Sequence, residues 1–444
     1  MRKMILFIVL LLIGSSILMA AAIPGESKDR PLYATDRIKI KLSDEAISRS
    51  ALPQGLYAEA FSFGINELDQ IFGRNGGQKI IRAHRRVRDT AWESATGFDR
   101  WFVIELSRDT DIETALAAYR NNRYVEHAGY EYFAYTQFIP NDPLYPNHWG
   151  HNNTGQLPVY QGGSHSGPGV GTPGFDSRAQ LAWDDTQGLG NASIIIAIID
   201  SGVDTAHPDL RLVAGYDYGD NDSNPMDDSA EPGHGTSCAG VAAAIGNNNL
   251  GVVGIAGGCS VMPLKVADSA GSMSFTSITN AITHAADNGA HIASLSLGAA
   301  VSPGYSPATD AAFVYAYNNG VTIFAATANA NTSTIDYPAN HPNVISVGAA
   351  SPTGQRKSTT SSDGENWWGS NYGVNTQDAA NAVDLMAATI LPTTDISGTA
   401  GYSNNNYYMW FNGTSCATPY AAGVGALVLS KAPHLTPAQL RSVL

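Results

Sequence analysis

The second part of this chain alternates short apolar runs with longer stretches of helical periodicity, and this alternation constrains the fold more than any other feature. The apolar runs, rich in β-branched residues, are Ile194–Ile199, Val261–Val266, His291–Leu297, Val321–Ala326 and Val344–Ala349. The helical patterns include Ser277–Asn288 and Pro307–Asn319. Continuous apolar runs are typical of strands buried on both faces. The sequence therefore predicts an α/β fold, a parallel sheet with helices on both faces, whose active site lies at the carboxyl ends of the strands.

The first part of the chain has a different pattern, which predicts a small α+β unit. Strands are expected at Arg37–Leu42, Gln78–Ala83, Trp101–Leu106 and Tyr124–Tyr135. One helix is expected around Ile65–Phe72, and a second begins where Thr110 and Glu113 form a capping box. The resulting order, β-α-β-β-α-β, is the split βαβ arrangement. Turn-rich segments at 140–143 and 161–174 are expected to link this unit to the next.

The amino terminus has the composition of a signal peptide. A positive start, Met1–Lys3, precedes the apolar stretch Met4–Met19 and the small residues Ala20–Ala22. We expect cleavage after residue 22 and a secreted or extracellular protein with no membrane attachment. An uncleaved membrane anchor is the alternative, which the Gly-Ser-Ser break at 14–16 disfavours.

Charge and cysteine content exclude several classes of protein. The net charge is −14, and the acidic excess lies entirely in residues 143–444, where no basic cluster occurs. We therefore expect neither nucleic acid nor anionic lipid as a partner. The three cysteines, Cys238, Cys259 and Cys416, allow at most one internal bridge, so a disulfide scaffold is excluded while their pairing stays open.

Three polar residues stand where a nucleophilic site could form. Asp200 ends a predicted strand, His234 opens a helix between two glycines, and Ser415 follows Gly413 at the start of another helix. A serine hydroxyl is a poor nucleophile unless a histidine takes its proton and a carboxylate holds that histidine. Each signal alone is weak, but together they predict an Asp-His-Ser triad.

These segments also resemble a known family. Asp200–Gly202, Gly233–Thr236 and Gly413–Pro419 are similar to the three signature blocks of the subtilisin family (subtilases, peptidase S8), in the same chain order. The resemblance covers residues 139–444. It implies a serine endopeptidase that hydrolyses polypeptide substrates through an acyl-enzyme intermediate, with no cofactor for catalysis.

The resemblance extends to further residues of the site. It implies that Asn329 stabilises the oxyanion. It also implies a substrate-binding segment that pairs with an extended peptide, formed by Ser296, Leu297, Gly298 and Ala299. The family usually has glycine where Ala299 and Ala328 stand, so we expect a narrowed specificity pocket. The stretch Thr353–Gly373 is interpreted as an insertion of unknown role.

Calcium is the expected cofactor, in a structural role. Asp217, Asp220 and Asp222 crowd three carboxylates into six residues, in a stretch that resembles a calcium loop of some family members. Asp209, together with Asn248, resembles the family's tight calcium site. The alternative for these residues is a solvated acidic turn.

The small unit resembles the family's inhibitory, chaperone-like propeptide. We expect residues 23–138 to inhibit the catalytic domain until the chain cleaves itself between Ala134 and Asn141; a non-inhibitory accessory domain is the alternative. The catalytic domain is expected to continue beyond Leu444 and to be monomeric. Rival hypotheses for the whole protein are a catalytically silent subtilisin-fold binding module and a processing enzyme that cuts few sites.

Overall fold

The computed structural model describes residues 33–52, 58–133, 138–156, 171–185, 188–230, 232–374, 379 and 381–444. The predicted signal peptide, half of the predicted cleavage region (residues 134–137) and most of the segment 161–174 lie outside these residues. The chain forms two compact units that divide between Thr136 and Gln137, and each is described by itself.

The small unit is a five-stranded antiparallel sheet in the order β2-β3-β4-β1-β5. Its strands are β1 (Tyr33–Leu42), β2 (Glu59–Ala60), β3 (Gly77–Arg82), β4 (Trp101–Leu106) and β5 (Val125–Tyr132). Its helices are α1 (Asp44–Arg49), α2 (Asn66–Arg74), α3 (Thr90–Thr96), the short η1 (Phe98–Arg100) and α4 (Ile112–Arg120). The predicted split βαβ order is present as β1-α2-β3-β4-α4-β5, because α2 and α4 share one buried core with these strands.

The predicted start of α4 is wrong by one residue. Asp111, not Thr110, is the residue that caps the helix, because its carboxylate accepts a hydrogen bond from the Glu113 N–H at 3.1 Å. The hydroxyl of Thr110 instead lies 2.8 Å from that of Ser107. A carboxylate also interacts favourably with the positive end of the helix, which favours Asp111 over its neighbour.

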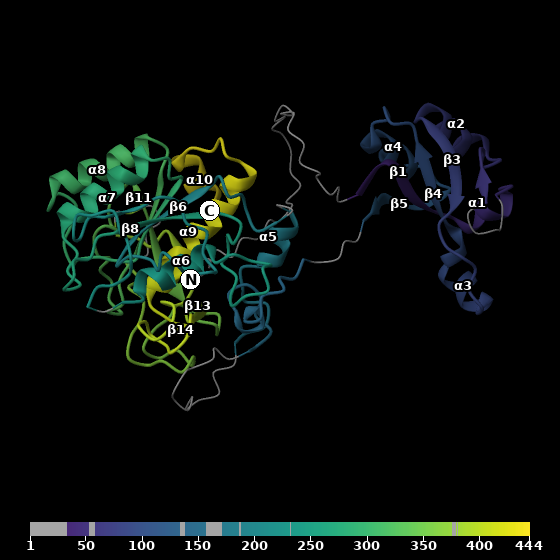
Figure 1. Cartoon of the computed structure of the whole chain (residues 1–444). Helices are drawn as coiled ribbons and strands as arrows, with labels where there is room; N and C mark the ends of the chain where they lie inside the picture. Colours follow the sequence, from purple (N-terminus) through teal and green to yellow (C-terminus); the bar gives the residue numbers. More distant parts are fainter. Residues whose placement is uncertain are drawn as a thin grey trace. The chain divides into compact units, whose positions relative to one another are not determined.

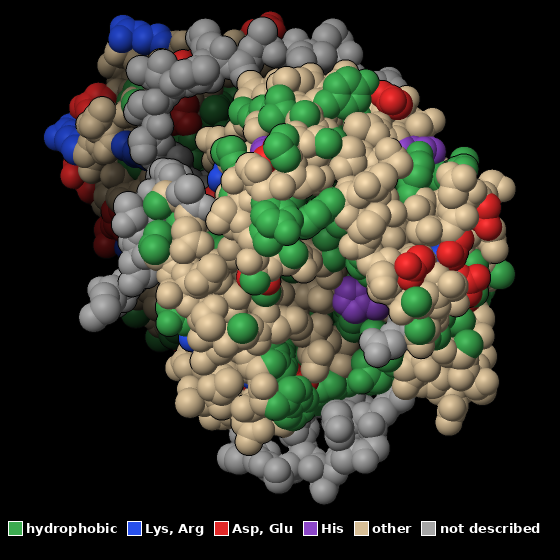
Figure 2. Space-filling model, turned by 90° about the vertical axis from the view of Figure 1, so that its left-hand side faces the viewer, with side chains coloured by type: hydrophobic (Ala, Val, Ile, Leu, Met, Phe, Trp, Pro, Cys, Tyr) green, Lys and Arg blue, Asp and Glu red, His purple; other side chains and the backbone are tan. Residues whose placement is uncertain are grey.

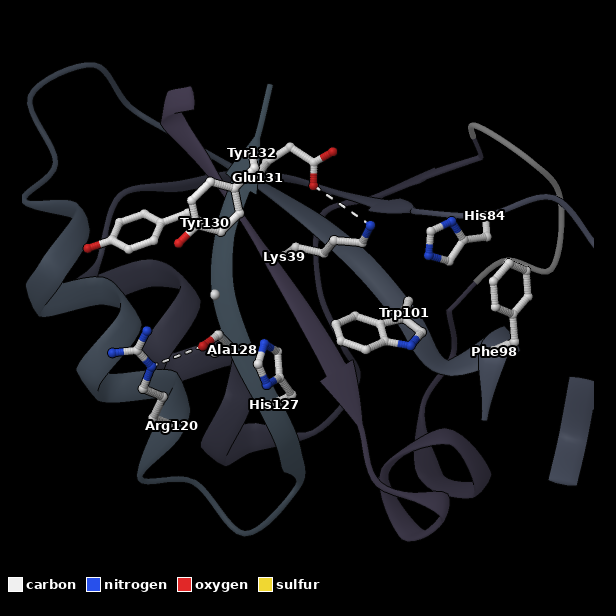
Figure 3. Close-up of a pocket in the computed structure, with 11 residues that line it drawn as sticks. Lys39, His84, Phe98, Trp101, Arg120, His127, Ala128, Tyr130, Glu131 and Tyr132 are labelled. Carbon is white, nitrogen blue, oxygen red and sulfur yellow. Dashed lines mark hydrogen bonds and ion pairs between the residues drawn. The ribbon is translucent and has the colours of Figure 1, made fainter. Parts of the chain in front are cut away.

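The small unit carries a hollow of about 630 Å³ along β1, β4 and β5. Figure 3 shows the side chains of Lys39, Trp101, His127 and Glu131 around it. Lys39 Nζ lies 3.9 Å from a carboxylate oxygen of Glu131 and 5.8 Å from the centre of the Trp101 ring. The hollow is thus lined by aromatic and paired charged groups.

The large unit is built on a seven-stranded sheet in the order β12-β11-β10-β9-β6-β8-β7, in which every neighbouring pair is parallel (Figure 1). The strands are β6 (Ile195–Asp200), β7 (Tyr216–Asp217), β8 (Ser260–Lys265), β9 (Ile292–Leu295), β10 (Thr322–Ala326), β11 (Val344–Ala350) and β12 (Leu385–Ala388). A separate hairpin pairs β13 (Leu391–Thr394) with β14 (Tyr407–Phe411).

Helices cover both faces of this sheet, which confirms the predicted α/β architecture. They are α6 (His234–Ala243) and α9 (Thr414–Lys431) on one face and α7 (Phe275–Asp287) and α8 (Pro307–Asn318) on the other. Alternate residues of β6 point to opposite cores: Ile196 and Ile198 pack with α6 and α9, whereas Ala197 packs with α7 and α8. The remaining elements are η2 (Tyr145–Asn147), α5 (Ala179–Asp185) and α10 (Pro437–Val443).

The segment 140–143, expected to be a linker, is instead fixed to the large unit. Asp142 is buried, and its carboxylate accepts a hydrogen bond from the Asn247 N–H at 2.7 Å. The neighbouring Leu144 N–H donates to the carbonyl oxygen of Gly251 at 2.8 Å. Turn composition predicted the local backbone correctly but could not show that a distant loop supplies partners for it.

The surface of the large unit agrees with its acidic composition. On the face shown in Figure 2, acidic side chains gather toward one edge while Lys and Arg are sparse. Among the residues that the structure describes, no helix is both long and apolar enough to cross a membrane.

Candidate active site

Asp200 is the last residue of β6, at the carboxyl end of the sheet where the sequence predicted a catalytic acid. Its side chain is buried, and one carboxylate oxygen accepts a hydrogen bond from the Ser201 N–H at 2.7 Å. The chain turns away at Gly202, whose φ of 118° favours glycine. A Cβ at this position would lie 2.6 Å from the Met226 carbonyl oxygen, so the tight turn requires glycine for two reasons.

His234 is the first residue of α6, and its ring faces Asp200. Nδ1 of His234 lies 2.7 Å from the same carboxylate oxygen of Asp200 that bonds Ser201. Burial lowers the pKa of His234, but the charge and hydrogen bond of Asp200 outweigh burial and raise the pKa above its ordinary value. With Nδ1 bonded to the carboxylate, Nε2 is the ring atom that can take a proton.

A second buried acid, Asp227, holds the first turn of α6 and was not predicted. One of its oxygens accepts hydrogen bonds from the backbone N–H groups of Gly233 and Thr236, both at 3.0 Å, and the other accepts from the Ser201 hydroxyl at 2.8 Å. Asp227 therefore ties the turn after Asp200 to the turn that carries His234. An acidic residue shortly before the Gly-His-Gly block was the only signal in the sequence.

Ser415 is the second residue of α9, where N–H groups have no partner within the helix. Its hydroxyl lies 3.4 Å from the Ser296 carbonyl oxygen. The thiol of Cys238, one turn after His234, lies 4.0 Å from His234 Nδ1 and 3.6 Å from the Ser415 carbonyl oxygen. The structure thus brings the three predicted triad residues to one place at the carboxyl edge of the sheet.

Asn329 follows β10 and reaches the same place. Its amide oxygen accepts hydrogen bonds from the backbone N–H and the hydroxyl of Thr414, at 2.8 and 2.9 Å. Because the oxygen is held there, the amide nitrogen Nδ2 faces Gly413, where a Cβ would lie only 3.3 Å from it. The side chain therefore presents a donor beside the N–H of Ser415, the arrangement that an oxyanion needs.

The predicted substrate-binding segment divides into two parts. Ser296 lies beside the nucleophile, because its hydroxyl donates to the Ser415 carbonyl oxygen at 2.8 Å. Ala299, in contrast, pairs with Tyr337 through its N–H and its carbonyl, at 2.8 and 2.9 Å. Both backbone groups of Ala299 are therefore taken, and strand addition by a peptide is left to the residues before it, Ser296, Leu297 and Gly298.

Ala328 departs from the usual glycine at a strained position. Its φ is 81°, in the left-handed region that costs a residue with a Cβ about 1 kcal/mol. The Ala328 carbonyl oxygen accepts a hydrogen bond from the Asn371 N–H at 2.9 Å, which holds this conformation. The methyl group thus lies on the backbone next to Asn329, the predicted oxyanion donor.

The turn at 217–222 does not fit a calcium ion, which corrects the prediction for Asp217, Asp220 and Asp222. Lys265, buried at the end of β8, places Nζ 2.8 Å from Asp217 and 3.0 Å from Asp220. It also lies 2.8 Å from Asp228. An ammonium group already pairs with these three carboxylates. Asp222 is exposed, and its carboxylate accepts a hydrogen bond from a backbone N–H of its own turn.

Lys265 stays charged in this environment. Burial lowers its pKa, but the hydrogen bonds that its ammonium donates to Asp217, Asp228 and Asp220 together raise the pKa above the ordinary value. The sequence could not show this pairing, because Lys265 belongs to another strand, distant along the chain from the acidic turn.

The second predicted calcium site fits a cation and includes one residue that was missed. Asp209 is fully buried, and its carboxylate accepts hydrogen bonds from the Asn248 side chain at 2.6 Å and the Val252 N–H at 3.3 Å. Burial raises the pKa of Asp209 to about 6, and the negative charge of Asp142 adds to this effect. Two buried carboxylates beside one loop are an oxygen-rich set suited to Ca²⁺.

The cysteines play no nucleophilic part. Cys238, Cys259 and Cys416 are all buried and free, so no disulfide forms among them. Burial raises the pKa of each thiol above its ordinary value. A protonated, buried thiol behaves as a small apolar side chain, so these cysteines do not compete with Ser415, the predicted nucleophile.

Comparison with known proteins agrees with this geometry. Residues 191–444 match the model of the subtilase family, Peptidase_S8. The chain is 39% identical over 256 residues to thermitase from Thermoactinomyces vulgaris, which covers 57% of this chain and 80% of that protein. It is 33% identical over 324 residues to a thermophilic serine proteinase from Bacillus sp. (strain AK1), and the match covers 72% of this chain and 67% of that protein. The solved structure of a protease from Pseudoalteromonas arctica superposes with a TM-score of 0.53 at 25% identity. The match covers 69% of this chain and 91% of that one.

Proposed function

The chain belongs to the subtilase family of serine-type endopeptidases, and we propose that it cleaves polypeptides with Asp200, His234 and Ser415 as its triad. One observation carries this assignment: the 2.7 Å contact between Asp200 and His234 lies where β6 and α6 meet the start of α9, which bears Ser415. We find nothing that favours a catalytically silent binding module.

The acylation step follows from this arrangement. The Ser415 hydroxyl oxygen bonds to the peptide carbonyl carbon while its proton passes to Nε2 of His234. Asp200 stabilises the imidazolium that forms, since it already accepts from Nδ1. The carbonyl oxygen becomes negative and accepts hydrogen bonds from the Ser415 N–H and from Asn329 Nδ2. A donor of this kind lowers the barrier by about 3–4 kcal/mol.

The tetrahedral intermediate then collapses to an acyl-enzyme. The C–N bond breaks, the leaving amine takes the proton from His234, and an ester to Ser415 remains. A water molecule next gives a proton to His234 and attacks this ester, forming a second tetrahedral intermediate. Its bond to the Ser415 oxygen breaks, that oxygen takes the proton back from His234, and the carboxylic acid product leaves. The extended peptide on the acyl side pairs with the backbone of Ser296, Leu297 and Gly298.

The protein is made as a secreted zymogen under this proposal. Residues 1–22 direct export, and residues 23–138 inhibit the catalytic domain until self-cleavage between Ala134 and Asn141. The support is that residues 33–133 form a compact unit with a hydrophobic core of its own. An independently folded unit can be released intact once the connecting chain is cut.

Calcium has a structural role at one site. Asp142, Asp209 and the 247–252 loop would hold the ion, whose charge would relieve the repulsion between the two buried carboxylates. The ion supplies no chemistry to the peptide cleavage, because its ligands belong to elements other than those that carry the triad.

Labelling of Ser415 tests the proposal directly. The full chain, allowed to process itself, is treated with an organofluorophosphate and assayed on casein. We expect covalent labelling at Ser415 and casein cleavage, and neither in Ser415→Ala. A folded, processed wild-type protein that is not labelled and cuts no peptide would favour the binding-module hypothesis.

A further inference from the structure

The segment 353–373, which the triad chemistry does not use, contains three buried charged side chains. Lys357 and Asp363 are fully buried and Glu365 is 1% exposed. Burying a charge is costly unless hydrogen bonds and ion pairs compensate. Three such residues within nine positions call for an account of what they bond.

Glu365 bonds outside its own segment. One carboxylate oxygen accepts hydrogen bonds from the indole N–H of Trp410 and from the Asn412 side chain, the latter at 2.6 Å. The other oxygen accepts from the indole N–H of Trp368. A buried carboxylate that accepts three donors holds them in a fixed arrangement.

Two of these donors lie immediately before the nucleophile. Trp410 belongs to β14, and Asn412 precedes Gly413, after which α9 begins with Thr414 and Ser415. Glu365 therefore holds the chain at the point where it turns into the helix that presents the Ser415 hydroxyl and N–H.

The same segment also holds the other oxyanion donor. The Gly369 N–H donates to the carbonyl oxygen of Asn329 at 3.3 Å, and the Asn371 N–H donates to that of Ala328 at 2.9 Å. Residues on either side of Trp368 thus bond the two loops that carry the proposed oxyanion donors. The Glu365 carboxylate bonds one loop, and the backbone N–H groups of Gly369 and Asn371 bond the other.

Lys357 and Asp363 bond to other residues of the same segment, 353–373. Nζ of Lys357 donates to the carbonyl oxygens of Ser358 and Glu365, both at 2.9 Å, and lies 3.5 Å from Asp363. Its ammonium also lies 4.8 Å from the centre of the Trp368 ring. Oδ1 of Asp363 also accepts a hydrogen bond from the Glu365 N–H at 3.1 Å, a bond that an Asn side chain can keep. None of these contacts reaches the 410–415 stretch, so Asp363→Asn, which removes only the ion pair, provides a matched control for Glu365.

We infer that Glu365 is a positioning residue of the oxyanion hole: its carboxylate, through Asn412 and Trp410, fixes the Ser415 N–H relative to Asn329. This inference rests on the proposed triad. Glu365 touches no substrate, and its effect is on the geometry that stabilises the transition state.

The test compares Glu365→Gln with Asp363→Asn in the self-processed full chain. A carboxamide at position 365 presents an NH₂ group to a donor, so at least one of the three bonds is lost. We expect kcat on a tetrapeptide p-nitroanilide to fall about tenfold while KM changes less than about twofold, the pattern of an interaction made in the transition state. Asp363→Asn should lower the thermal midpoint about as much as Glu365→Gln does, but it should leave kcat unchanged.

Trp410→Phe serves if Glu365→Gln does not fold. It keeps most of the ring and removes one N–H donor, so we expect a smaller fall in kcat at constant KM, matched by slower labelling of Ser415. Active-site titration corrects every rate for unprocessed chain. Wild-type kcat in both variants, or an equal loss of kcat in Asp363→Asn, would overturn the inference. A wild-type protein that is itself inert would instead contradict the proposed function.

Discussion

Two clusters of carboxylates in the large unit, each with at least one buried member, balance their negative charge in different ways. At the 217–228 turn, the chain supplies its own cation, Lys265, to Asp217, Asp220 and Asp228. At the 247–252 loop, Asp142 and Asp209 have amide and backbone donors but, among the described residues, no ion pair. The acidic residues alone look alike in the sequence, and only the distant partner decides which cluster needs a metal ion.

The largest effect is expected from removing the internal cation. Lys265→Met leaves Asp217 buried without a counter-charge, and we expect a loss of about 3 kcal/mol in the free energy of unfolding, since Asp220 and Asp228 reach solvent and are screened. Urea denaturation of the folded chain measures it. Lys431→Met, which removes an exposed lysine at the end of α9, is the control and should change stability by less than about 1 kcal/mol, because solvent screens an ion pair at an exposed position.

Chelation should affect the other cluster alone. Removing calcium with EGTA is expected to lower the thermal midpoint, because an ion present at about 100 times its dissociation constant contributes about 2.7 kcal/mol. Asp209→Asn should abolish this response, whereas Lys265→Met should retain it. A wild-type thermal midpoint that EGTA does not change would contradict the calcium proposal. Neither cluster would then depend on a bound metal ion.

Much of this comparison could not have been drawn from the sequence. Apolar runs predicted the central strands and the placement of Asp200, His234 and Ser415 at element ends, because those signals are local. Lys265 and Asp142 were missed, since each acts through a partner on a distant segment. The prediction that Ala299 pairs with a substrate peptide was wrong for the same reason, because its backbone pairs with Tyr337, a residue distant in the sequence. Edge strands such as β7, only two residues long, carry too little periodicity to be detected.

A pH titration of the metal-free protein sharpens the contrast further. The folded pKa of Asp209, about 6, lies above the value near 4 of an unfolded aspartate, so the folded state binds more protons between these values. Stability should therefore fall as pH rises from about 4 to about 6 and stay lower above it. Thermal midpoints across this range measure the slope, which Asp209→Asn should reduce; an identical slope in that variant would contradict the assignment.

The smallest effect is expected at Asp222. It belongs to the acidic run, and its exposed carboxylate accepts a hydrogen bond from the Asn224 N–H at 2.7 Å. Asn can accept the same bond, so Asp222→Asn should change the free energy of unfolding by less than about 0.5 kcal/mol. A loss above about 2 kcal/mol by urea denaturation would show that the turn depends on this carboxylate after all.

The docking of Asp142 has a practical consequence for how such an enzyme ages. A cut anywhere from residue 134 to 141 leaves Asp142 on the working enzyme, only a few positions from its newly made amino end. Exopeptidases that remove amino-terminal residues one at a time would leave activity unchanged until they reach Asp142. Removal of Asp142 would then take away a ligand of the proposed calcium ion. The rate at which the stored enzyme loses activity would then depend on the few residues before Asp142, which are not part of the proposed triad.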